Sequence, residues 1–141
     1  MMEDFNLLQI TTLKAATFYL NSNSTVRQAL EKFAYHKFLV VPIVDNEGHY
    51  VTSLSEGDIL HYIYANNDFS LANAEKINVL DIERHRPYNP VRVDATMDEL
   101  YALALNQNFI PVVDDRNIYI GIIKRRDVFV YLKKKLDQSE L

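Results

Sequence analysis

The sequence predicts a mixed α/β fold built from two copies of one β-α-β-β-α motif. Two segments of the 141-residue chain, residues 40–45 and 109–114, share a short β-branched run with an internal proline and a final aspartate. Such a run is typical of a buried strand that enters a turn. The match continues without a gap to Asp58 and Asp127. It therefore predicts a second strand and the start of a helix in each copy.

A further helix is expected before each strand pair. Thr25 and Thr96 are good N-caps, because their hydroxyl oxygens can accept a backbone hydrogen bond. Apolar residues follow both at helical spacing, namely Val26, Ala29, Leu30 and Phe33 in the first copy and Met97, Leu100, Ala104 and Leu105 in the second.

Turn-forming residues separate the two strands of each copy, at residues 45–48 and 114–117. The closing helices are expected to start near residues 55–58 and 124–127. The second of them carries three consecutive lysines, at 133–135, which suit the negative end of a helix dipole.

These elements predict a first motif over residues 8–66, a connector and lead-in over 67–90, and a second motif over 91–137. The connector is polar, contains Pro87 and Pro90, and is expected to form a short helical turn over residues 74–82. A motif of roughly 60 residues buries little apolar surface, so the two are expected to share one core.

Composition excludes several classes of function. A net charge of −4 and a pI of about 5.5 argue against a nucleic-acid binder, which needs a positive surface. The absence of cysteine excludes disulfides and thiolate chemistry. The acidic start and the lack of a long apolar run predict a cytoplasmic protein without membrane association. Three glycines are too few for glycine-rich phosphate loops.

The repeated pattern resembles the CBS (cystathionine-β-synthase) motif, and two in tandem resemble a CBS pair, or Bateman module. The family's ligand signature is Gly-apolar-apolar-(Thr or Ser)-x-x-Asp. Residues 52–58 and 121–127 align with it, and both end in aspartate. Ser55 fits the hydroxyl position, whereas Lys124 departs from it and Thr52 replaces the glycine.

This resemblance implies a non-catalytic regulatory module with two sheets packed face to face and two clefts related by pseudo-twofold symmetry. It implies a regulatory ligand rather than a cofactor, either an adenine nucleotide (AMP, ADP or ATP) or cyclic di-AMP. It also implies a homodimer, and an unidentified effector protein that responds to a conformational change.

The resemblance assigns the ribose hydroxyls to Asp58 and Asp127, and the phosphate to Ser55 in the first copy. In the second copy Lys124, Arg125 and Arg126 place three cations at a helix N-terminus, which is unfavourable for the helix unless an anion binds there. The alternatives are that each aspartate only complements its helix dipole and that the cations are a solvated surface cluster. Because the first copy lacks these cations, the Asp127 cleft is expected to be the stronger one.

The base would lie in an apolar slot beside the repeated strand, formed by Val40, Val41, Pro42, Phe109, Ile110 and Pro111. Plain core packing is the alternative for these side chains. Thr17 and Arg92 lie in the lead-in segments, which line the same clefts in the family.

No enzyme is expected. The four histidines show no metal-ligand spacing and no nucleophile stands near one, so neither a metal site nor a catalytic site is predicted. The second hypothesis is a ligand-free module for protein interaction or dimerisation, in which Lys124 itself could fill the phosphate place.

Overall fold

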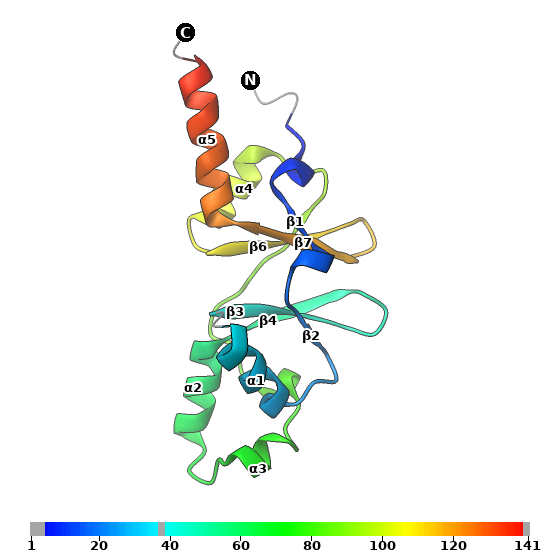
Figure 1. The fold of residues 1–141 in the computed structure, drawn as a ribbon, viewed down its shortest axis with the longest axis vertical. Coiled ribbons are helices and arrows are strands. Elements are labelled where there is room, and N and C mark those ends of the chain that lie inside the picture. The colour runs from blue at the N-terminus through cyan, green and yellow to red at the C-terminus, as the bar shows by residue number, and fades with distance from the viewer. Residues whose placement is uncertain (1–4, 37–38, 140–141) are drawn as a thin grey trace. The chain divides into compact units, whose positions relative to one another are not determined.

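The computed structural model describes residues 5–36 and 39–139 and confirms the mixed α/β class (Figure 1). Contacts divide the chain into two compact units, one made of Met1–Thr17 with Tyr88–Leu141 and the other of Phe18–Pro87. The N-terminal segment therefore folds with the second repeat. No helix in the described part of the chain is long and apolar enough to cross a bilayer.

The unit formed by Phe18–Pro87 contains a three-stranded sheet in the order β2-β3-β4, with β2 parallel to β3 and β3 antiparallel to β4. Its elements are β2 (Leu20–Asn21), α1 (Val26–His36), β3 (Val40–Val44), β4 (Tyr50–Ser55), α2 (Glu56–Ala65), α3 (Leu71–Ala74) and the 3-10 helix η3 (Val79–Asp81). Its core joins α1 and α2 to the strands and includes Val26 and Phe33 of α1, Val41 of β3, Leu54 of β4 and Ile59 of α2.

The other unit has a four-stranded sheet in the order β1-β7-β6-β5. Its elements are η1 (Leu7–Ile10), β1 (Thr12–Leu13), η2 (Lys14–Ala16), β5 (Val91–Arg92), α4 (Met97–Ala104), β6 (Phe109–Val113), β7 (Tyr119–Lys124) and α5 (Arg125–Ser139). Each unit has its own hydrophobic core, in place of the single shared core that the sequence predicts. The core of this unit includes Leu7, Leu100, Ile110, Ile123 and Val128.

The predicted helix starts and turns are confirmed. The Thr96 hydroxyl accepts from the Glu99 amide at the start of α4, and Thr25 accepts from the Gln28 amide at 3.2 Å. In the turn of the first repeat, the amides of Glu47 and His49 both donate to one Asp45 oxygen. The His49 amide is the main reason that the pKa of Asp45 is lowered.

Gly121 holds the N-terminal segment against the sheet. β1 pairs antiparallel with β7, and Leu13 lies opposite Gly121. A Cβ atom at position 121 would lie 2.1 Å from the carbonyl oxygen of Thr12. Thr52 occupies the matching position in β4, which is an edge strand of its sheet and has no such neighbour. The departure of Thr52 from the glycine pattern therefore has a steric explanation.

Gly121→Ala should destabilise the fold by about 1–3 kcal/mol, because either β1 or β7 must move to relieve the clash. Gly57→Ala is the matched control. A Cβ there would meet only the Ser55 hydroxyl, at 3.6 Å, and alanine favours the helix by about 0.5 kcal/mol. Urea unfolding followed by circular dichroism measures both. Equal midpoints for the two variants would contradict the close packing of β1.

Candidate functional site

A pocket of about 360 Å³ lies between the N-terminal segment and helix α5. Polar and apolar side chains share its wall: Gln9, Ile10, Thr11, Thr12, Asp127, Val130, Tyr131 and Lys134. Its volume falls within the range of about 300–1,000 Å³ that is common for small-molecule sites.

Helical periodicity supplies one wall of this pocket. Asp127, Val130, Tyr131 and Lys134 follow the spacing i, i+3, i+4, i+7, so they lie on one face of α5. The other wall is the segment from Gln9 to Thr12, which the pairing of β1 with β7 holds in place.

Two local contacts fix the pocket's walls. The ring of Tyr131 packs against that of Phe5, with centroids 4.9 Å apart. The Thr11 hydroxyl donates to the Leu7 carbonyl at 2.6 Å, which closes the end of η1. The pocket is therefore built by residues that also hold the N-terminal segment on α5.

Asp127 is available to a ligand. It is half-buried on the first turn of α5, and its carboxylate makes no hydrogen bond or ion pair to any other residue that the structure describes. The Lys134 ammonium lines the same pocket, two helical turns away. The pocket therefore combines a hydrogen-bond acceptor for hydroxyls, a cation for an anionic group and an apolar patch at Ile10 and Val130.

Asp58 occupies the matching position in the first repeat, but both oxygens of its carboxylate already accept hydrogen bonds from the backbone. It is only 4% exposed. One oxygen accepts from the Ser55 amide at 3.0 Å, and the other accepts from the His85 amide at 2.9 Å. The Ser55 hydroxyl in turn accepts from the Asp58 amide at 3.0 Å, which completes a capping box at the start of α2.

The connector approaches Asp58 at His85, a contact that sequence reasoning missed. The imidazole rings of His85 and His61 lie with centroids 4.3 Å apart. Both side chains are exposed. Within the described residues no group of three or more potential metal ligands occurs. The pair therefore adds to the contact between the connector and α2.

The three cations near Asp127 have different surroundings. Arg125 is anchored, because its Nε atom donates to the carbonyls of Ala104 at 2.7 Å and Gln107 at 3.1 Å, beside the C-terminal end of α4. Lys124 is exposed at the end of β7, and Arg126 is exposed on α5. The geometry gives Arg125 a structural role and leaves the charges of Lys124 and Arg126 accessible.

The predicted base slot coincides with the two buried strands. In β6 the side chains of Phe109, Ile110 and Pro111 are buried, and in β3 those of Val41 and Pro42 are buried while Val40 is half-buried. Ile110 and Val41 belong to the hydrophobic cores. Phe109 stacks on Tyr88, with centroids 5.0 Å apart and planes inclined by 26°. All six side chains thus contribute to packing, and none lines the pocket beside Asp127.

The two lead-in residues lie on different segments of the same unit. Thr17 ends η2, where its hydroxyl donates to the Lys14 carbonyl at 2.8 Å and accepts from the Tyr119 hydroxyl at 3.0 Å. Arg92 is exposed in β5, with Nε 4.0 Å from an oxygen of Asp94. Neither residue lines the Asp127 pocket, whose N-terminal wall is formed by residues 9–12 instead.

Comparison with protein families identifies the chain. A model of the CBS domain matches it twice, over residues 14–65 and 79–134. The chain belongs to the CBS domain family. No curated protein matches its sequence.

Solved structures of CBS proteins share the fold. CbpB in complex with c-di-AMP matches with a TM-score of 0.84 and 18% identity, over 96% of this chain and 89% of that one. CbpB of Listeria monocytogenes in complex with c-di-AMP matches with a TM-score of 0.78 and 18% identity, over 94% and 98%. CBSX2 in complex with AMP matches with a TM-score of 0.74 and 22% identity, over 93% and 98%.

The two matched aspartates should differ in their effect on stability. Asp58→Ala removes the acceptor of the Ser55 and His85 amides and should cost about 2 kcal/mol. Asp127→Ala removes only a favourable charge from the first turn of α5 and should cost less than about 1 kcal/mol. Chemical denaturation of the two variants measures the difference. A larger loss for Asp127→Ala would show that its carboxylate has a structural partner.

Proposed function

We propose that this chain is a non-catalytic sensor that binds an adenine nucleotide in the pocket beside Asp127. The observation that carries the proposal is the contrast between the two matched aspartates. The Asp127 carboxylate lines a pocket and makes no hydrogen bond or ion pair within the described part of the chain. Asp58, by contrast, is buried and hydrogen-bonded to the chain's own backbone.

The pocket offers the groups that a nucleotide requires. One carboxylate can accept hydrogen bonds from both ribose hydroxyls, which is the role proposed for Asp127. Lys134 lines the pocket, and Lys124 and Arg126 are exposed near the start of α5. These three cations would neutralise phosphate charge.

The similar structures support a nucleotide as the ligand. Proteins with this fold occur in complexes with c-di-AMP and with AMP. We propose the adenine nucleotides and cyclic di-AMP as candidates. Binding between the N-terminal segment and α5 would change how these two elements pack, and a dimer partner or an effector protein would read that change.

The first repeat is proposed to bind nucleotide weakly or not at all. A ribose at Asp58 would have to displace the amide of His85 or that of Ser55. Each of these is a hydrogen bond to a charged acceptor, worth about 1.5–3 kcal/mol. The expected stoichiometry is therefore one mononucleotide per chain.

Calorimetric titration with AMP, ADP, ATP, cyclic di-AMP and, as a base control, GMP tests the proposal. At least one adenine ligand should bind, and Asp127→Ala should weaken it by about tenfold to a hundredfold, as expected for the loss of a charged hydrogen-bond acceptor. Lys134→Ala should weaken binding and reduce its dependence on salt.

The matched control is Asp58→Ala, measured at a temperature where the variant remains folded. Its affinity for nucleotide should equal that of the wild type. If no adenine ligand binds, or if Asp127→Ala binds as well as the wild type, the sensor proposal fails. The ligand-free interaction module then becomes the better hypothesis.

A further inference from the structure

The segment that forms one wall of the Asp127 pocket has a counterpart in the connector. Residues 6–10, Asn-Leu-Leu-Gln-Ile, recur at residues 78–82 as Asn-Val-Leu-Asp-Ile. In both copies the asparagine side chain accepts a hydrogen bond from the amide two residues later and caps a 3-10 helix. The first residue of each helix is buried in the core of its own unit. Residues 81–84 therefore correspond to the pocket wall at residues 9–12.

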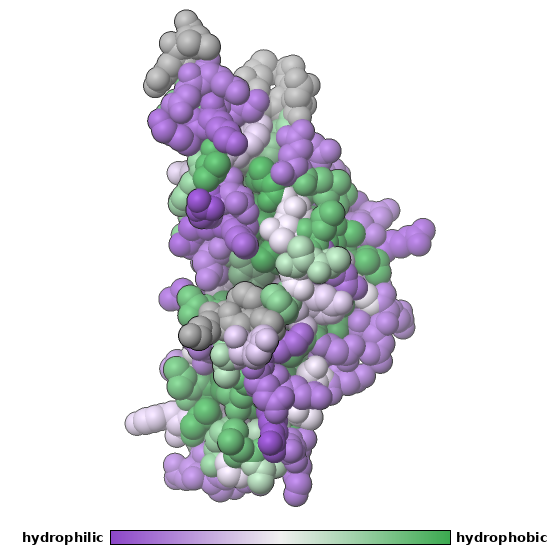
Figure 2. Space-filling model, in the orientation of Figure 1, coloured by the Kyte–Doolittle hydropathy of each residue, from purple (hydrophilic) through white to green (hydrophobic). Residues whose placement is uncertain are grey.

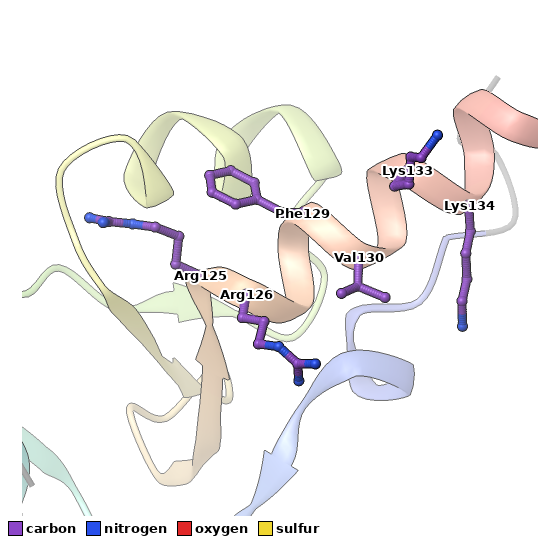
Figure 3. Close-up of a pocket in the computed structure, with 6 residues that line it drawn as sticks. All are labelled: Arg125, Arg126, Phe129, Val130, Lys133 and Lys134. Carbon is purple, nitrogen blue, oxygen red and sulfur yellow. The ribbon is translucent and has the colours of Figure 1, made fainter.

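The closing helices correspond as well, but their side chains differ at the pocket. Figure 3 shows the α5 side chains that line a concave surface of about 610 Å³, and two of them, Val130 and Lys134, also line the Asp127 pocket. At the positions that match these two, α2 has His61 and Ala65. The first repeat therefore has an imidazole where the second has an apolar side chain of the pocket wall.

A second imidazole, from the connector, meets His61. The ring centroids of His61 and His85 lie 4.3 Å apart, and the ring planes are inclined by 44°. The two residues are 24 positions apart in the sequence, which is why the spacing of the histidines gave no sign of the pair. Both side chains are exposed, and Figure 2 shows hydrophilic side chains over much of the face that it displays. The pair is therefore open to a ligand from solvent.

The separation of the two rings suits two ligands of one metal ion. Because a metal–nitrogen bond is about 2.0–2.1 Å long, two imidazoles that bind one ion at 90° place their centroids about 4.5 Å apart, and at the tetrahedral angle about 5.2 Å apart. The observed 4.3 Å is close to the first value, and exposed side chains can rotate to turn a nitrogen towards the ion. No third potential ligand joins the pair in the described part of the chain, so water would complete the coordination.

The charges beside the pair favour a cation. Asp58 lies one helical turn before His61, and its buried carboxylate accepts the His85 amide but makes no ion pair within the described residues. Two arginines, Arg84 and Arg86, flank His85 and would oppose the ion. Both are exposed, so solvent and salt screen their charges, whereas the charge of a buried carboxylate is screened much less. The attraction of Asp58 for an ion on the pair therefore outweighs the repulsion.

We propose that His61 and His85 bind one divalent transition-metal ion of the class that imidazole prefers, namely Cu²⁺, Ni²⁺ or Zn²⁺. The ion would fasten the connector to α2 and so hold the His85 amide on the Asp58 carboxylate. Metal binding at this pair requires no nucleotide. Together with the proposed function, it gives the two repeats different ligands at corresponding places, a metal ion in the first and a nucleotide in the second.

Calorimetric titration of the full chain without nucleotide tests the site, with Cu²⁺, Ni²⁺ and Mg²⁺ as the probes. Cu²⁺ should bind more tightly than Ni²⁺, and Mg²⁺ should not bind, because imidazole is a poor ligand for a hard cation. The expected stoichiometry is one ion per chain. Loss of a group that only orients a ligand costs about 10–100-fold in metal affinity, so His61→Ala and His85→Ala should each weaken Ni²⁺ by at least about tenfold.

Two features of the variants separate metal binding from folding. His85→Ala keeps the backbone amide that donates to Asp58, so unfolding would not explain its loss of affinity. His49→Ala is the matched control, since His49 lies in the same unit and pairs with Asp45 instead of a second histidine. This variant should bind Ni²⁺ as the wild type does.

Nuclear magnetic resonance with Zn²⁺ tests the effect on the connector. The ring signals of His61 and His85 should shift while those of His49 do not, and hydrogen exchange of the His85 amide should slow, because the connector opens less often once it is fastened to α2. Removal of the ion with EDTA should reverse both changes. A pair of histidines that only packs would show neither.

Several outcomes would overturn the proposal. Equal Ni²⁺ affinities of the wild type and His61→Ala, or equal Zn²⁺ shifts at His49, would reduce the binding to adventitious metal on surface histidines. A metal-dependent dimer in sedimentation would assign the two imidazoles to an ion shared between chains. Unchanged exchange of the His85 amide at saturating Zn²⁺ would reject the fastening of the connector. If metal binds but no nucleotide does, the metal site stands and the sensor proposal fails.

Discussion

The pairing of β1 with β7 determines where the Asp127 pocket forms in this protein. The pair is short, but it fixes the N-terminal segment on the sheet of the second repeat, and the carbonyl of Thr12 lies where any side chain at position 121 would have to be. Once that segment is in place, η1 packs beside α5 and forms the second wall of the Asp127 pocket. The pocket exists because a glycine permits two backbones to approach each other.

The two repeats show how one sequence pattern can have two physical outcomes. Asp58 and Asp127 each stand in the first turn of a closing helix. The hydroxyl of Ser55, three residues before Asp58, accepts a hydrogen bond from the Asp58 amide and completes a capping box. The His85 amide donates to the other oxygen of the Asp58 carboxylate. Lysine at the corresponding position 124 has no acceptor to offer, so no such box can form there. The first repeat uses its aspartate for stability, and the second keeps its aspartate accessible.

Local patterns predicted the elements well and the long-range contacts poorly. Thr25 and Thr96 were identifiable as caps because capping depends on residues three positions away. By contrast, the amide of His85 reaches Asp58 from the connector, and the pocket's N-terminal wall comes from the far end of the chain. The periodic set on α5 was visible in the sequence, but nothing local indicated what would face it. Gly121 was the one signal of a close backbone approach.

The cations of the second repeat illustrate why charge in a sequence does not by itself identify a binding site. Three consecutive basic residues were expected to act together on one anion. In the structure Arg125 donates to the carbonyl of Ala104, the last residue of α4, and to that of Gln107 just beyond it, where a cation is favourable for that helix. Arg126 instead lies in a row with Val130 and Lys134, four residues apart. Neighbours in sequence are about 100° apart around a helix, so a basic run at a helix start is divided among different faces. Helical geometry therefore separates the side chains of the basic run. Further along α5, Val130 and Lys134 line both the Asp127 pocket and the concave surface that contains Arg126.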